Sequence, residues 1–143
     1  MRKFNLVFLI LITLLFLSGC TNNEEYESLE TETFIQSLKD RGYTVIKPEI
    51  EEGTTPHTFF SVYPTYYEAD GKRLAIYEYK NVKKAKKDSE MISKDGSTIG
   101  NAQVEPIDQP HYYHIGKIIV SYIGSDAELQ KDLSEILGKS ITN

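Results

Sequence analysis

An apolar run near the N-terminus most constrains what this chain can fold into. Leu6 to Leu17 is a stretch of twelve residues in which only Thr13 is polar, and Arg2 and Lys3 place positive charge before it. A membrane-spanning helix needs about 20 apolar residues, so this run is too short to span a bilayer comfortably. Its length and basic flank are typical of the hydrophobic region of a signal peptide. We therefore expect residues 1–19 to be a targeting segment outside the folded domain.

The residues at the end of this run resemble the cleavage site of bacterial lipoproteins. Leu17-Ser18-Gly19-Cys20 has a leucine, two small residues and a cysteine in the order of a lipobox. The resemblance implies that a diacylglyceryl group is attached to the Cys20 sulfur and that the chain is cut just before this residue. Two acyl chains suffice for stable membrane anchoring, whereas one chain is marginal. The alternative is an ordinary signal peptide followed by a chance cysteine.

The segment after Cys20 is expected to be an acidic tether. Residues 21–32 include five glutamates and few apolar side chains, so they bury little surface. As a coil this segment reaches about 20 Å, and fully extended it reaches about 40 Å. The expected organisation is a lipoprotein signal peptide at 1–19, the lipidated Cys20 and tether at 20–32, and one α+β domain at 33–143.

Composition narrows the class of function. The 143 residues carry 16 Lys and Arg against 21 Asp and Glu, a net charge of -5, whereas nucleic-acid binders are usually basic. A single Cys excludes an internal disulfide and a metal site built from several thiolates. The chain contains no Walker, G-x-S-x-G, G-x-G-x-x-G or H-E-x-x-H motif. We therefore expect no nucleic acid, cofactor or metal, and no catalysis.

Hydrophobic periodicity predicts three helices and about five strands. The expected helices cover 33–41, 82–93 and the stretch between Ser125 and Gly138, and the expected strands cover 43–47, 58–68, 72–80 and a hairpin over 111–123. Asp70-Gly71 is a strong type I′ turn signal. Hairpins imply antiparallel pairing and amphipathic helices imply a covered sheet face. We expect an α+β fold of order α-β-β-β-α-β-β-α, with helices on one face of the sheet.

Side-chain caps are predicted at the start of each helix. Thr33 and Gln36 have the spacing of a capping box, and Ser125 and Glu128 repeat it before the last helix. Asn81 stands where it can cap the second helix.

A cluster of lysines at the start of the second helix departs from the usual distribution of charge along helices. Cations are unfavourable there by about 0.3–1 kcal/mol each, because a helix N-terminus carries partial positive charge. Such a site could hold an anion, such as a lipid head group or a wall polymer. The candidate anion-binding residues are Lys80, Asn81, Lys83, Lys84 and Lys87. The alternative is a solvated helix face, with the i,i+4 pairs Lys84–Asp88 and Lys86–Glu90.

The segment His111-Tyr112-Tyr113-His114 is a candidate contact surface. Tyr is enriched at protein interfaces, and one Tyr of the pair should face outward from a strand. The alternative for the tyrosines is packing between strands, and for the histidines it is exposed imidazoles near a hairpin. His111 and His114 should lie on opposite faces of a strand, so they are not expected to share a metal.

The segments 77–101 and 110–124 resemble small uncharacterised lipoproteins of Bacillus-type bacteria. The resemblance implies a Gram-positive-type cell membrane and implies no activity. We therefore expect a lipid-anchored, extracytoplasmic binding domain whose partner is an envelope protein or a wall polymer. Two alternatives stay open, an envelope hydrolase without a motif and anion binding through the lysines of residues 80–87.

Overall fold

The computed structural model describes residues 30–49 and 57–143. The expected signal peptide, Cys20 and nearly all of the expected tether lie outside the described residues. The described residues contain three helices and seven strands, in the order α3 (Thr31–Asp40), β1 (Val45–Ile46), β2 (Thr65–Ala69), β3 (Lys72–Glu78), α4 (Val82–Ser89), β4 (Thr98–Ile99), β5 (Ala102–Gln103), β6 (Pro110–Ile115), β7 (Ile118–Ile123) and α5 (Ala127–Leu137). Within these described ranges, no helix combines the length and apolar character needed to cross a bilayer.

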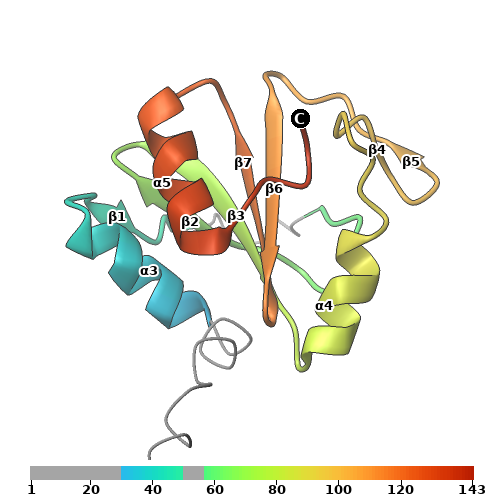
Figure 1. Ribbon diagram of the computed structural model, residues 1–143, viewed down its shortest axis with the longest axis horizontal. Coiled ribbons are helices and arrows are strands. Elements are labelled where there is room, and N and C mark those ends of the chain that lie inside the picture. The colour runs from blue at the N-terminus through green and yellow to red at the C-terminus, as the bar shows by residue number, and fades with distance from the viewer. Residues whose placement is uncertain (1–29, 50–56) are drawn as a thin grey trace, which may run out of the picture.

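The main sheet has five antiparallel strands in the order β1-β2-β3-β7-β6. The β2–β3 and β6–β7 hairpins pair neighbouring strands, and β3 pairs with β7 to join the two hairpins at the centre of the sheet (Figure 1). This arrangement confirms the predicted α+β class and the order α-β-β-β-α-β-β-α. The short strands β4 and β5 form a separate ribbon in a stretch to which the sequence assigned little structure.

The helices cover both faces of the sheet, whereas the sequence predicted one covered face. α3 and α5 pack on one face with Leu74, Ile118 and Val120, while Ala85 of α4 packs on the other with Ile119 (Figure 1). The reason is that β7 is apolar on both sides. Ile118, Ile119 and Val120 follow one another and each is fully buried, although successive side chains of a strand point to opposite faces. Burying all three requires a layer on each side.

The turn and cap predicted around β3 and α4 are confirmed. Asp70 and Gly71 have φ angles of 48° and 78°, as a type I′ turn requires at both central positions. The Asn81 side chain accepts a hydrogen bond from the Lys84 N–H at 3.0 Å, which caps α4. α4 is shorter than predicted and ends at Ser89. The strand predicted over 58–68 begins only at Thr65, and residues 57–64 contain no strand. Pro64 has no backbone N–H to donate to a neighbouring strand.

The two predicted capping boxes are wrong. α3 begins at Thr31 after Glu30, which makes no side-chain cap, and the Gln36 amide donates to Asp40 at 2.8 Å. At α5 the capping residue is Asp126, one residue later than predicted, and it accepts from the Leu129 N–H at 2.8 Å. Asp is as good an N-cap as Ser, so a one-residue shift costs the helix nothing.

Residues 140–143 run beside β6, an edge strand of the sheet. The Ile141 N–H donates to the Tyr112 carbonyl at 2.7 Å, and the Thr142 hydroxyl donates to the Pro110 carbonyl at 2.8 Å. The Thr142 hydroxyl oxygen also accepts from the Tyr112 N–H at 3.3 Å. These bonds satisfy backbone groups of β6 that no other strand of the sheet reaches.

Candidate anion-binding site beside helix α4

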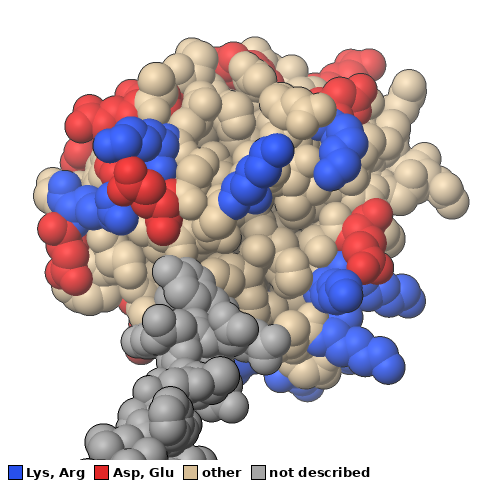
Figure 2. Space-filling view, viewed as in Figure 1, with Lys and Arg blue, Asp and Glu red and all other residues tan. Residues whose placement is uncertain are grey.

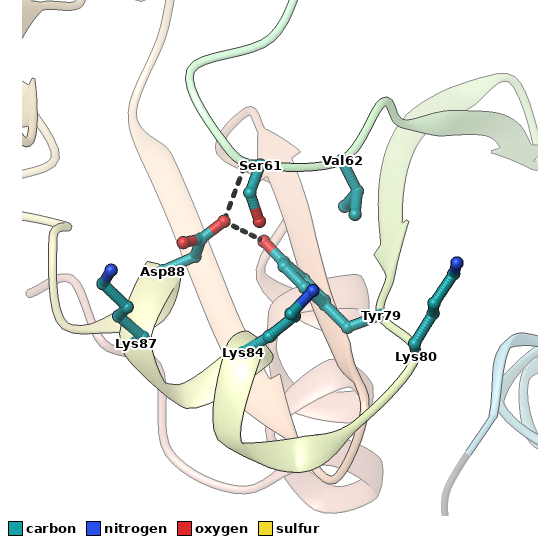
Figure 3. A pocket seen from close by; sticks show the side chains of 7 residues that line it. All are labelled: Ser61, Val62, Tyr79, Lys80, Lys84, Lys87 and Asp88. Carbon is teal, nitrogen blue, oxygen red and sulfur yellow. Dashed lines mark hydrogen bonds between the residues drawn. The ribbon is translucent and has the colours of Figure 1, made fainter.

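A hollow of about 400 Å³ lies beside α4, and three lysines are among the residues that line it (Figure 3). Lys84 and Lys87 project from one side of α4, because residues three apart lie on the same face of a helix. Lys80 reaches the hollow from the link between β3 and α4. The full lining is Ser61, Val62, Tyr79, Lys80, Lys84, Lys87 and Asp88.

Asp88 joins the three segments that form this hollow. Its side chain is only 5% exposed, and one carboxylate oxygen accepts from the Ser61 N–H at 2.7 Å and from the Tyr79 hydroxyl at 3.0 Å (Figure 3). Burial and the nearby Asp88 carboxylate raise the pKa of Tyr79, so its hydroxyl stays protonated and donates. Asp88 therefore holds α4, the end of β3 and the segment 57–64 in a fixed arrangement.

The three lysines of the hollow form no ion pair with any carboxylate of residues 30–49 or 57–143. The ion pairs of the described chain lie elsewhere and involve Arg41, Lys72, Arg73, Lys117 and Lys131. The predicted Lys84–Asp88 pair is absent because the Asp88 carboxylate is directed toward Ser61 and Tyr79. The predicted Lys86–Glu90 pair is also absent. The hollow thus combines three ammonium groups with one buried carboxylate, of which Oδ2 accepts the two hydrogen bonds.

The structure brings together three of the five predicted anion-binding residues. Lys80, Lys84 and Lys87 line the hollow. Asn81 caps α4 instead, and Lys83 is exposed outside the lining. Sequence reasoning missed Ser61, Tyr79 and Asp88. For Asp88 the available signal was a lone acid in a lysine-rich helix, but its spacing from Lys84 favoured an ion pair.

The predicted contact surface at residues 111–114 is wrong. His111, Tyr112 and Tyr113 are buried, and His114 is half-buried. The reason is again that both sheet faces are covered: Tyr113 packs on the side of α5 and Tyr112 packs on the side of α4 with Phe60. The expectation of an exposed imidazole fails for His111, whose Nε2 lies 3.0 Å from the Gly124 carbonyl oxygen.

His114 points to the α4 side of the sheet, and its Nε2 lies 3.2 Å from the Gly116 carbonyl oxygen. Burial lowers the pKa of His114. Across the portion of the chain that the structure describes, no three or more His, Cys, Asp or Glu side chains are grouped to hold a metal ion.

Comparison with known proteins finds no matching family model, no matching curated protein and no matching solved structure. The interpretation of the hollow therefore depends on its own geometry and charge.

Proposed function

We propose that this chain is a lipid-anchored, extracytoplasmic binding domain that holds a phosphate-bearing ligand in the hollow beside α4. The observation that carries the proposal is the convergence of Lys80, Lys84 and Lys87 on one hollow without an ion pair to a described carboxylate. The anchor is supported by the lipobox-like residues 17–20.

The chemistry of the hollow suits charge recognition of a phosphodiester. Each lysine ammonium is a compact charge with three donors, and lysines bind phosphate without demanding one fixed geometry. A volume of about 400 Å³ lies within the range of ordinary small-ligand sites, so it accommodates a phosphate and the group that carries it. Ligands of this class outside the membrane include anionic wall polymers and lipid head groups.

An envelope hydrolase has less support. The lining includes a serine and an acid but no histidine. The Asp88 carboxylate accepts from the Ser61 backbone N–H rather than from its hydroxyl, so it is not placed as a base for that nucleophile.

A matched pair of variants tests the binding site. Lys84→Gln/Lys87→Gln removes two lysines of the hollow, whereas Lys83→Gln/Lys86→Gln removes the same charge from the same helix outside the lining. The probe is poly(glycerol phosphate), and binding to the lipidated protein in neutral detergent is measured by calorimetry. We expect the first variant to bind about 30-fold more weakly, which is about 1 kcal/mol per lysine. The second should bind no more than about threefold more weakly, through the long-range effect of charge.

Equal losses in the two variants would mean that overall charge, and not the hollow, holds the polymer. No loss in either variant would refute the site. Urea unfolding of both variants controls for folding, since exposed substitutions of this kind change stability by about 0.5 kcal/mol or less.

The anchor is tested at Cys20. Cells given labelled palmitate should incorporate the label into the native protein, and Cys20→Ala should abolish it because the acylated sulfur is gone. Continued labelling of the variant would show that the anchor assignment is wrong.

A further inference from the structure

We infer that the domain turns the start of α4 toward the bilayer that carries its anchor, where the lysines of residues 80–87 contact anionic lipid head groups. The inference rests on the proposed anchor at Cys20, and it deepens the proposed function by naming the source of the phosphate.

The first step is the place where the chain enters the domain. Glu30, the first described residue, forms an ion pair with Lys117 in the turn between β6 and β7. The Lys117 carbonyl accepts from the Tyr79 N–H at 2.9 Å, and Tyr79 directly precedes Lys80. The Thr31 hydroxyl also donates a hydrogen bond to the Glu78 carboxylate at 2.5 Å. The start of α3, the β6–β7 turn and the start of α4 therefore lie at one end of the molecule (Figure 1).

The second step is the length of chain available between the anchor and the domain. Ten residues lead from Cys20 to Glu30, and ten residues span at most about 36 Å in any conformation. A domain of about 110 residues has a radius of gyration near 13 Å and is therefore roughly 34 Å across. Turning the opposite end to the membrane would need almost the whole contour length. The end that contains the start of α4 faces the membrane with a much shorter span of connecting chain.

The third step is charge. Five of the 16 Lys and Arg residues of the chain lie within residues 80–87, although the chain is acidic overall. Lys and Arg side chains gather at the lower right of the surface, over α4 (Figure 2). At this end Glu30 pairs with Lys117 and the Glu78 carboxylate accepts from the Thr31 hydroxyl, while Glu32 in the first turn of α3 is exposed. α4 is about 12 Å long, so its lysines lie within one to two screening lengths of its start, the range over which surface charge acts.

The fourth step favours a lipid surface over a soluble polymer. Phe59 is 36% exposed and Tyr63 is 64% exposed, and they flank Ser61 and Val62 of the hollow in sequence. Exposed aromatic side chains beside lysines are typical of surfaces that lie at the head-group level of a bilayer. A soluble polyanion would leave these aromatic side chains in water.

Lysine labelling of the native lipidated protein tests this orientation without any substitution. The protein is reconstituted into vesicles of equal phosphatidylglycerol and phosphatidylcholine, or of phosphatidylcholine alone, and treated with a water-soluble acylating reagent. Peptide mass spectrometry then gives the rate at each lysine. We expect Lys80, Lys84 and Lys87 to react at least fivefold more slowly in the anionic vesicles at low salt, a factor that corresponds to about 1 kcal/mol. Lys131 in α5 and Lys139, two residues after its end, should react at equal rates in the two vesicle types.

Equal rates at Lys80, Lys84 and Lys87 in the two vesicle types would overturn the inference. If poly(glycerol phosphate) in detergent still slows labelling of these lysines, the proposed binding function survives while the membrane orientation fails. If neither the anionic vesicles nor poly(glycerol phosphate) slows labelling of these lysines, the proposed binding function and the membrane orientation both fail. Slow labelling in both vesicle types that is relieved by Glu24→Gln, Glu25→Gln and Glu27→Gln would identify the preceding acidic segment as the occupant and would also overturn the inference.

Discussion

The carboxylate of Asp88 should be one of the largest single polar contributions to the stability of this domain. It is buried, and it accepts hydrogen bonds from the Ser61 N–H and the Tyr79 hydroxyl, which are 27 and 9 residues away in sequence. Asp88→Ala leaves both donors without this acceptor. Tyr79 is itself buried, so its hydroxyl cannot turn to solvent without local opening of the fold.

The expected loss of stability in Asp88→Ala follows from these two hydrogen bonds. A hydrogen bond to a charged group contributes about 1.5–3 kcal/mol, and a buried donor left unpaired costs about 1–3 kcal/mol. Removing the buried carboxylate also relieves its desolvation, which offsets part of the loss. We therefore expect Asp88→Ala to lower the free energy of unfolding by about 3 kcal/mol. Asp88→Asn keeps an acceptor without the charge, so it should cost about 1–2 kcal/mol.

Urea unfolding measures these costs, and a double-mutant cycle isolates the Asp88–Tyr79 bond. Tyr79→Phe alone should cost about 1.5 kcal/mol, but close to nothing in the Asp88→Ala background, because the acceptor is already gone. Glu90→Ala is the control, since Glu90 is exposed at the end of the same helix and should change stability by about 0.5 kcal/mol or less. A loss below about 1 kcal/mol for Asp88→Ala, or strictly additive costs in the cycle, would refute this account.

Two further predictions concern pH and backbone conformation. Burial lowers the pKa of His114, so the unfolded chain binds the imidazole proton more tightly than the folded chain does. The stability that His114 contributes is complete above about pH 6.5 and is lost as the pH falls below it, and His114→Gln should reduce the difference in urea midpoint between pH 7.5 and 5.5. Gly71→Ala should cost about 1–2 kcal/mol from its φ of 78° alone, since open space surrounds the added Cβ. Gly96→Ala should cost more in the same assay, because its Cβ would lie 2.5 Å from Pro110 Cγ.

The features that sequence predicted correctly depend on residues close together along the chain. Asp70-Gly71 forms the expected turn, and Asn81 caps the expected helix. Leu129 and Leu133 form the buried side of α5, as their spacing of four residues predicts. In each case the partner lies within a few residues, so local rules decide the outcome.

The features that sequence missed depend on partners far along the chain. α4 packs on the second face of the sheet, and this alone converts Tyr112 from a candidate contact residue to a buried one. The signal was present in the unbroken apolar run Ile118–Val120, which is typical of a strand covered on both sides. The role of Asp88 could not be read in the same way, because the sequence predicted a strand over 58–68, whereas Ser61 lies in a loop before β2 that packs against α4.

The pairing of residues 140–143 with β6 has a consequence for the proposed anchoring of this domain to a membrane. An edge strand with open N–H and C=O groups is a template for pairing with another copy, and confinement to a membrane raises the frequency of such encounters. The bonds from Ile141 and Thr142 occupy the Tyr112 and Pro110 backbone groups that a second sheet would use. At the opposite edge, β1 offers only two residues. Both edges of the sheet are thus poor starting points for aggregation.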